Sequence, residues 1–125
     1  MTAAAWIAFL AAAALGAPAR YVVDRFVQVR TRGVFPWGTL VVNVTGCLGL
    51  GTLTGLGLYH GLRSGTRTVV GSGGIGAYTT FSTFAYETVR LLEQGATREA
   101  VRSVIANAGL GVTAAGAGLA LATAL

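Results

Sequence analysis

Four long apolar segments dominate the chain, and short connections that carry most of the charges separate them. The segments cover about residues 3–23, 37–59, 68–92 and 100–125. About twenty apolar residues are enough for a helix to cross the roughly 30 Å hydrocarbon core of a bilayer. Only 10% of the 125 residues are charged, whereas soluble domains carry about 25%. The sequence therefore predicts an all-α integral membrane protein, one domain (residues 1–125) with four transmembrane helices in the lipid bilayer.

The first apolar segment also has the composition of a secretory leader. However, no basic residue precedes it, and three further apolar segments follow. A cleaved signal peptide normally begins with a positively charged stretch. We therefore interpret the segment as the first membrane helix.

The basic residues, all arginines, are unevenly distributed over the connections. Cytoplasmic loops of membrane proteins are enriched in basic residues, so the side with more arginines is predicted to face the cytoplasm. Six arginines flank the first and third connections and two flank the second: Arg25, Arg30, Arg32, Arg90, Arg98 and Arg102 against Arg63 and Arg67. This bias places both termini on the outer side of the cell membrane. The arginines of the connections also account for the net positive charge without a nucleic-acid partner.

The third segment has an unusual composition for a membrane helix. Four of the six residues from Gly71 to Gly76 are glycines, and four hydroxyl residues follow between Thr79 and Thr83. Each glycine costs a helix about 1 kcal/mol relative to alanine. The sequence therefore predicts a helix broken near Gly76–Thr79, around mid-membrane. Irregular backbone at that depth must be buried or line a polar cavity, and broken helices often form ion sites.

A few polar and aromatic side chains lie within the apolar segments. Arg20 and Glu87 would be costly in contact with lipid, so ionisable residues at such positions usually belong to a functional site. The alternative is that both side chains extend along the helix and reach the membrane interface. The amide of Asn43 can face an anion or bond to another helix. Phe81 and Phe84 share a helix face, and they either pack against a neighbour or offer their positive ring edges to an anion.

Enzymatic chemistry has no support in the sequence. The only histidine, His60, lies at a helix end, and no cluster of metal-binding or nucleophilic residues occurs. The pattern Gly71-x-Gly73-x-x-Gly76 matches a dinucleotide-binding motif, but no βαβ unit surrounds it. We therefore interpret the chain as a non-enzyme.

Three runs of residues resemble one known family, the Fluc/CrcB fluoride channels. They occur in the same order in the first three segments: Gly16-Ala17-x-x-Arg20, Pro36-Trp37-Gly38-Thr39-Leu40-x-x-Asn43-x-x-Gly46, and Thr79-Thr80-Phe81-Ser82-Thr83-Phe84-x-x-Glu87. The fourth segment departs from the family pattern: Ser103 and Asn107 stand where members often carry tyrosine and serine.

The resemblance implies an antiparallel dimer that conducts fluoride. The residues that it implies for the fluoride pathway are Asn43, Phe81, Phe84, Thr80, Ser82, Thr83, Ser103 and Asn107. It also implies a structural sodium ion that is not transported, held by the backbone carbonyls of Gly76 and Thr79. Arg20 would lie near an aqueous vestibule and raise the local anion concentration.

The second subunit and the activity leave alternatives open. The arginine bias indicates a fixed orientation, which calls for a paralogue inserted the opposite way, and the alternative is a homodimer that inserts both ways. Passive fluoride export is the main functional hypothesis. A non-conducting partner subunit and a small proton-coupled exporter are the other two, although Glu87 is the only acid within the predicted spans apart from Asp24 at the first boundary.

Overall fold

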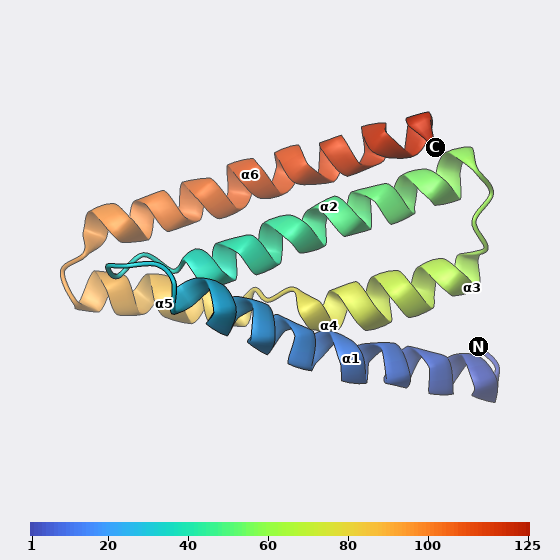
Figure 1. Cartoon of the computed structure of the whole chain (residues 1–125), viewed down its shortest axis with the longest axis horizontal. Helices are drawn as coiled ribbons and strands as arrows, with labels where there is room; N and C mark the ends of the chain where they lie inside the picture. The colour runs from blue at the N-terminus through green and yellow to red at the C-terminus, as the bar shows by residue number, and fades with distance from the viewer.

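The computed structural model describes residues 1–125, and its regular structure is entirely helical (Figure 1). In chain order the elements are α1 (Ala3–Gln28), α2 (Trp37–Tyr59), α3 (Ser64–Arg67), the π-helical stretch η1 (Thr68–Ile75), α4 (Gly76–Tyr78), α5 (Ser82–Glu93) and α6 (Thr97–Ala124). Three helices, α1, α2 and α6, are long and apolar enough to cross a membrane. The shorter elements from α3 to α5 together run the length of the molecule, and we call them the third crossing. The prediction of an all-helical, multi-pass membrane protein is confirmed.

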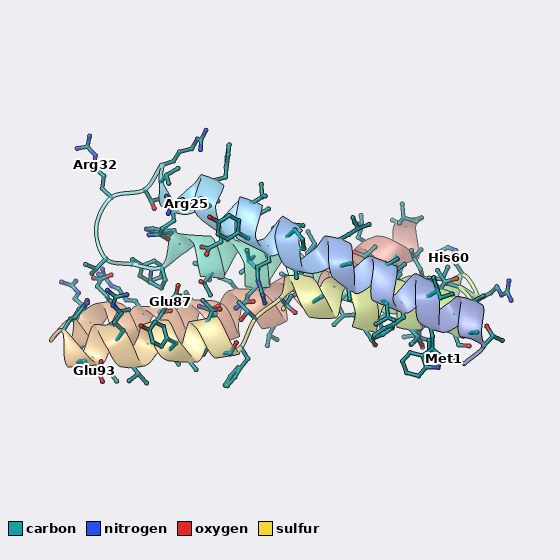
Figure 2. The ribbon with its side chains drawn as sticks, turned by 90° about the horizontal axis from the view of Figure 1, so that it is seen from below. Met1, Arg25, Arg32, His60, Glu87 and Glu93 are labelled. Atoms are coloured by element: carbon teal, nitrogen blue, oxygen red, sulfur yellow. The ribbon has the colours of Figure 1, made fainter.

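The crossings lie side by side along the long axis of the molecule (Figure 1). The α2 helix packs along α6, and α1 packs against η1 and α4. Both termini and the α2–α3 connection lie at one end, whereas the α1–α2 and α5–α6 connections lie at the other. Arg25, Arg32 and Glu93 lie at this second end, opposite Met1 and His60 (Figure 2).

Small residues bring α2 and α6 into close contact. A Cβ atom added at Gly51 would overlap the carbonyl group of Ala115, and one at Gly118 would overlap the carbonyl of Leu48. Close approach of this kind stabilises helix pairs in lipid, where hydrophobic burial contributes little. The contact fixes α2, and with it Asn43, relative to α6.

The interruption of the third crossing lies slightly later than the sequence predicts. The helix continues through Gly76 and ends at Tyr78, and Thr79 adopts an extended conformation with φ −76° and ψ 160°. The glycines serve contact with α1: a Cβ atom at Gly73 would lie 2.9 Å from the carbonyl oxygen of Phe9, and one at Gly16 would overlap the backbone of η1. Close packing therefore offsets the glycine cost, and the helix breaks at Thr79–Phe81.

The first helix extends to Gln28, five residues beyond the expected end. The Gln28 side chain accepts a hydrogen bond from the Gly38 backbone N–H at 3.1 Å and donates to the Phe35 carbonyl at 3.3 Å. These bonds tie the α1–α2 connection to the start of α2. They also fix the register between α1, which carries Arg20, and α2, which carries Asn43.

Candidate functional site

The Asn43 side chain of α2 holds the interrupted helix in place. Its Oδ1 accepts from the Thr80 backbone N–H at 2.9 Å, and its Nδ2 donates to the Thr80 carbonyl at 2.9 Å. A buried peptide group without partners is costly, because its bonds to water are lost. One side-chain amide thus replaces both backbone partners that Thr80 would have in a continuous helix.

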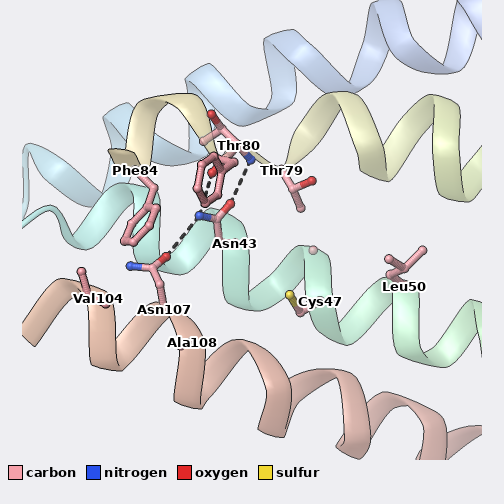
Figure 3. A pocket seen from close by; sticks show the side chains of 11 residues that line it. Asn43, Cys47, Leu50, Thr79, Thr80, Phe84, Val104, Asn107 and Ala108 are labelled. Atoms are coloured by element: carbon pink, nitrogen blue, oxygen red, sulfur yellow. Dashed lines mark hydrogen bonds between the residues drawn. The ribbon is translucent and has the colours of Figure 1, made fainter. Parts of the chain in front are cut away.

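A second asparagine extends this network to α6. The Asn43 Nδ2 donates to Asn107 Oδ1 at 3.1 Å (Figure 3), and Asn107 Nδ2 donates to the Ser103 carbonyl at 2.9 Å. The network therefore connects α2, the interruption and α6. Both N–H groups of Asn43 are engaged, so an anion can bind to this amide only by displacing Thr80 or Asn107.

The hydroxyl of Thr80 caps the helix that restarts after the interruption. It accepts from the Thr83 backbone N–H at 3.1 Å and donates to the Thr83 hydroxyl at 3.1 Å. Threonine commonly satisfies a free N–H at a helix start in this way. The Thr83 hydroxyl keeps its own hydrogen free, and the exposed Ser82 hydroxyl lies 3.4 Å from that of Thr80.

A groove of about 460 Å³ lies beside the interruption, between α2, α5 and α6. We call it the Asn43 groove (Figure 3). The Phe81 and Phe84 rings line it, with centroids 5.8 Å apart and planes inclined by 57°. The Phe81 side chain is 78% exposed in the single subunit. The other lining residues are Asn43, Gly46, Cys47, Leu50, Thr79, Thr80, Val104, Asn107 and Ala108.

A smaller cavity of about 190 Å³ lies between α1, α2 and the interruption. We call it the Arg20 cavity; it is lined by Ala17, Arg20, Tyr21, Asp24, Thr39, Val42, Thr80 and Thr83. Thr80 lines both hollows. Two buried side-chain atoms, the Thr39 hydroxyl oxygen and Glu87 Oε2, have no hydrogen-bond partner. The Thr39 hydroxyl lies at the wall of this cavity and also faces the Glu87 carboxyl group, without a hydrogen bond of 3.5 Å or shorter.

Comparison with known proteins identifies the family. The family model described as "CrcB-like protein, Camphor Resistance (CrcB)" matches residues 7–119. The chain belongs to the CrcB family. It is 49% identical over 120 residues to the "Fluoride-specific ion channel FluC 1" of Streptomyces avermitilis, and the aligned region covers 96% of this chain and 97% of the relative. It is 46% identical over 124 residues to the protein of the same name from Frankia casuarinae, covering 94% and 96%.

The structure brings together five of the eight residues expected in a CrcB-type fluoride pathway. These five line the Asn43 groove: Asn43, Thr80, Phe81, Phe84 and Asn107. Thr83 lines the Arg20 cavity instead. Ser103 is fully buried behind Asn107, and Ser82 is exposed next to the groove residues.

Arg20 has a more specific contact than the expected vestibule position suggests. Its Nη1 donates to the Thr79 carbonyl at 3.3 Å. The guanidinium therefore places a positive charge at the interruption itself and satisfies one carbonyl of the broken helix. Sequence reasoning missed this contact, and it also missed Thr39 and Asp24 as cavity residues. The four-residue spacing of Arg20 and Asp24 on α1 was the one available signal, because it puts both on one helix face.

The two carbonyls expected to bind sodium differ in their surroundings. The Gly76 carbonyl accepts no hydrogen bond, because its helical partner, the Thr80 N–H, bonds to Asn43 instead. Gly76 is also exposed. The Thr79 carbonyl already accepts from Arg20, but a carbonyl has a second lone pair. The donor set is therefore compatible with a cation, with one oxygen free and one shared.

Replacing Asn43 with leucine tests the role of its amide. Asn43→Leu leaves the Thr80 N–H and carbonyl unpaired, which costs about 1–3 kcal/mol for each buried group. We expect the backbone amides of residues 79–84 to exchange with deuterium at least about fivefold faster, because local opening becomes easier. Thr54→Val is the control, since it removes a hydroxyl that bonds only within α2. Unchanged exchange in Asn43→Leu would contradict the role given to the amide.

Proposed function

We propose that this chain is a subunit of a fluoride-specific channel through which fluoride leaves the cell passively, lowering its cytoplasmic concentration. Two relatives with nearly complete coverage are named fluoride-specific ion channels. The observation that carries the proposal is the interrupted third crossing, because it brings hydroxyls, amides and ring edges together within a chain of otherwise apolar helices. The proposed activity is ion conduction, without an enzymatic step.

The available donors suit a small, strongly hydrated anion. Such an ion needs replacements for its water, yet each site must bind weakly enough for the ion to leave. The Thr83 hydroxyl has a hydrogen that no other group accepts, and the Thr39 hydroxyl lies next to the Glu87 carboxyl group without a short hydrogen bond to it. The edges of Phe81 and Phe84 carry partial positive charge. These neutral donors would contact fluoride in turn, while Arg20 would attract it toward the interruption.

The two hollows define the proposed route. Fluoride would pass along the Asn43 groove, past Phe81 and Phe84, and Thr80 is the residue that this groove shares with the Arg20 cavity. Phe81 is too exposed in one subunit to form a closed pathway. A second subunit would therefore complete the wall of the groove.

A pair of matched substitutions tests the aromatic part of the route. Phe81→Ile keeps an apolar side chain but removes the ring edge. We expect fluoride efflux from reconstituted liposomes to slow by about tenfold or more, the effect of raising the barrier by about 1.4 kcal/mol. Phe26→Ile changes an exposed phenylalanine that lies on α1, away from the groove. It serves as the control and is expected to conduct normally.

The outcomes of this experiment separate the functional alternatives. Efflux that is equal in Phe81→Ile and the original chain would contradict the proposed route. No efflux from the chain alone, restored by a paralogue, would indicate a subunit that needs its partner to conduct. Efflux that requires a pH gradient would support a proton-coupled exporter instead.

We propose an antiparallel dimer in the plasma or inner cell membrane, with both termini outside. Six arginines flank the connections at one end and two flank the connection at the other, a bias that favours one orientation. A subunit fixed in this way needs a partner inserted the opposite way. A paralogue with the reverse arginine bias fits this requirement better than a second copy of the chain.

Cross-linking between opposite ends of two subunits tests this arrangement. With Cys47 replaced by serine, one set of subunits carries Arg63→Cys and the other carries Gln94→Cys, at opposite ends of the molecule. We expect no cross-link between positions 63 and 94 when the chain is expressed alone. When the paralogue is present, we expect efficient cross-links between position 63 or 94 of this chain and the opposite end of the paralogue. A cross-link between position 63 of two subunits serves as the control for parallel association. Efficient linkage in the chain alone would show that it forms antiparallel homodimers.

We further propose that the Gly76 and Thr79 carbonyls hold a structural sodium ion at the subunit contact. The free Gly76 oxygen supports this, and the ion would satisfy it and add fixed positive charge beside the anion route. Arg20 would share the Thr79 oxygen with the ion. Because ligand binding stabilises the folded state, replacing sodium with N-methylglucamine is expected to lower the melting temperature of the purified assembly. An equal melting temperature in both buffers would contradict the proposal.

A further inference from the structure

A third hollow, separate from the proposed ion route, lies at the end of the molecule with most of the arginines. It has a volume of about 740 Å³ and lies between the α1–α2 connection, the start of α2 and the first half of α6. We call it the Trp37 groove. Its α6 residues occupy a different face of the helix from Val104, Asn107 and Ala108 of the Asn43 groove, as the rotation of 100° per residue requires.

The Trp37 groove has a polar mouth and an apolar floor. Arg32 of the connection and Arg102 of α6 lie at the mouth, and Arg102 is 3.3 Å from Glu99. The Arg102 side chain is 54% exposed despite this contact, so part of its guanidinium remains available. Apolar side chains from both helices line the rest of the groove, which we call its floor: Leu40 is buried, and Ile105 and Leu110 are 65% and 50% exposed. The mouth therefore carries a net positive charge, whereas the floor suits hydrocarbon.

The dimensions of the groove correspond to one leaflet of a bilayer. It extends along α6 from Glu99 to Leu110, a rise of about 16 Å at 1.5 Å per residue. Half of the hydrocarbon core is about 15 Å. Trp37, which is 43% exposed at the mouth, is of the residue type that concentrates at membrane interfaces. The polar mouth thus lies where lipid headgroups occur, and the floor runs toward mid-membrane.

We propose that the Trp37 groove binds an anionic phospholipid from the leaflet that faces the α1–α2 and α5–α6 connections. Arg32 and the free N–H groups of Arg102 donate to the lipid phosphate, because guanidinium groups bind phosphate oxygens strongly. One acyl chain lies along the apolar floor. A free phosphate ion would occupy only the mouth, whereas a lipid fills the mouth and the floor together, so a lipid is the better match.

A second copy of the chain is a poorer occupant for electrostatic reasons. An antiparallel copy would bring its other end, with Arg63 and Arg67, toward the basic mouth of the groove, and a parallel copy would bring a second Arg32. Like charges next to each other oppose association. An anionic headgroup is the complementary partner.

Fluorescence quenching by brominated lipids tests the proposal in the assembled protein in vesicles. The chain has two tryptophans, so Trp6→Phe leaves Trp37 as its only one. The probes are phosphatidylcholine vesicles that contain a small, equal fraction of brominated phosphatidylglycerol or brominated phosphatidylcholine. We expect the anionic lipid to compete about fivefold better for the site next to Trp37 at low salt, the effect of one net positive charge near anionic lipid.

Charge-matched variants assign this preference to the groove. Arg32→Gln with Arg102→Gln is expected to make quenching by the two lipids equal. Arg25→Gln with Arg98→Gln removes the same charge at the same end, outside the groove, and is expected to retain most of the preference. In Trp37→Phe, which leaves Trp6 at the opposite end, quenching is expected to be the same for both headgroups.

Two results would overturn the proposal. Equal quenching of Trp37 by the two lipids would mean that the groove contacts bulk lipid without selection. Weak quenching by both would mean that protein, such as a second subunit, covers the groove. Neither result bears on fluoride flux, so the lipid site can fail while the channel assignment stands.

Discussion

The arrangement of this site depends on the pairing between the Asn43 amide and the Thr80 backbone. A helix that stops within an apolar bundle exposes peptide groups that lipid cannot satisfy. The Asn43 side chain supplies a donor and an acceptor, both at 2.9 Å. With Thr80 held in this way, its hydroxyl is free to cap α5 and its side chain lines both hollows. Without the pairing, the simplest alternative is a continuous helix that hides the same groups.

Glycine contacts make this arrangement geometrically possible. Gly16 and Gly73 let α1 approach η1, and Gly51 and Gly118 let α2 approach α6. Each contact brings a polar residue within reach of the interruption: Arg20 on the α1 side, and Asn43 and Asn107 on the other. The proposed ion route is thus a consequence of helix packing by small residues, since larger side chains would move these groups apart.

Local sequence patterns predicted the helices well but the site only in part. Apolar length was enough for the crossings, and the hydroxyl-rich run indicated an interruption. The glycines placed it slightly early, at Gly76–Thr79 instead of Thr79–Phe81, because their helix cost is offset by contact with α1, which no local pattern records. The partners of Asn43 and Arg20 lie 37 and 59 residues away in sequence, so their roles as supports for the broken helix required the structure. The resemblance supplied candidate residues, and the structure separated groove residues such as Asn107 from buried ones such as Ser103.

Solid-state NMR of the labelled chain in lipid bilayers would detect the Asn43–Thr80 pairing itself. We expect non-helical carbon chemical shifts at Thr79 and Thr80, between helical shifts on both sides, together with close contact between the Asn43 side-chain carbonyl carbon and the Thr80 nitrogen. Helical shifts without interruption from Ser64 to Glu93, with no such contact, would contradict it.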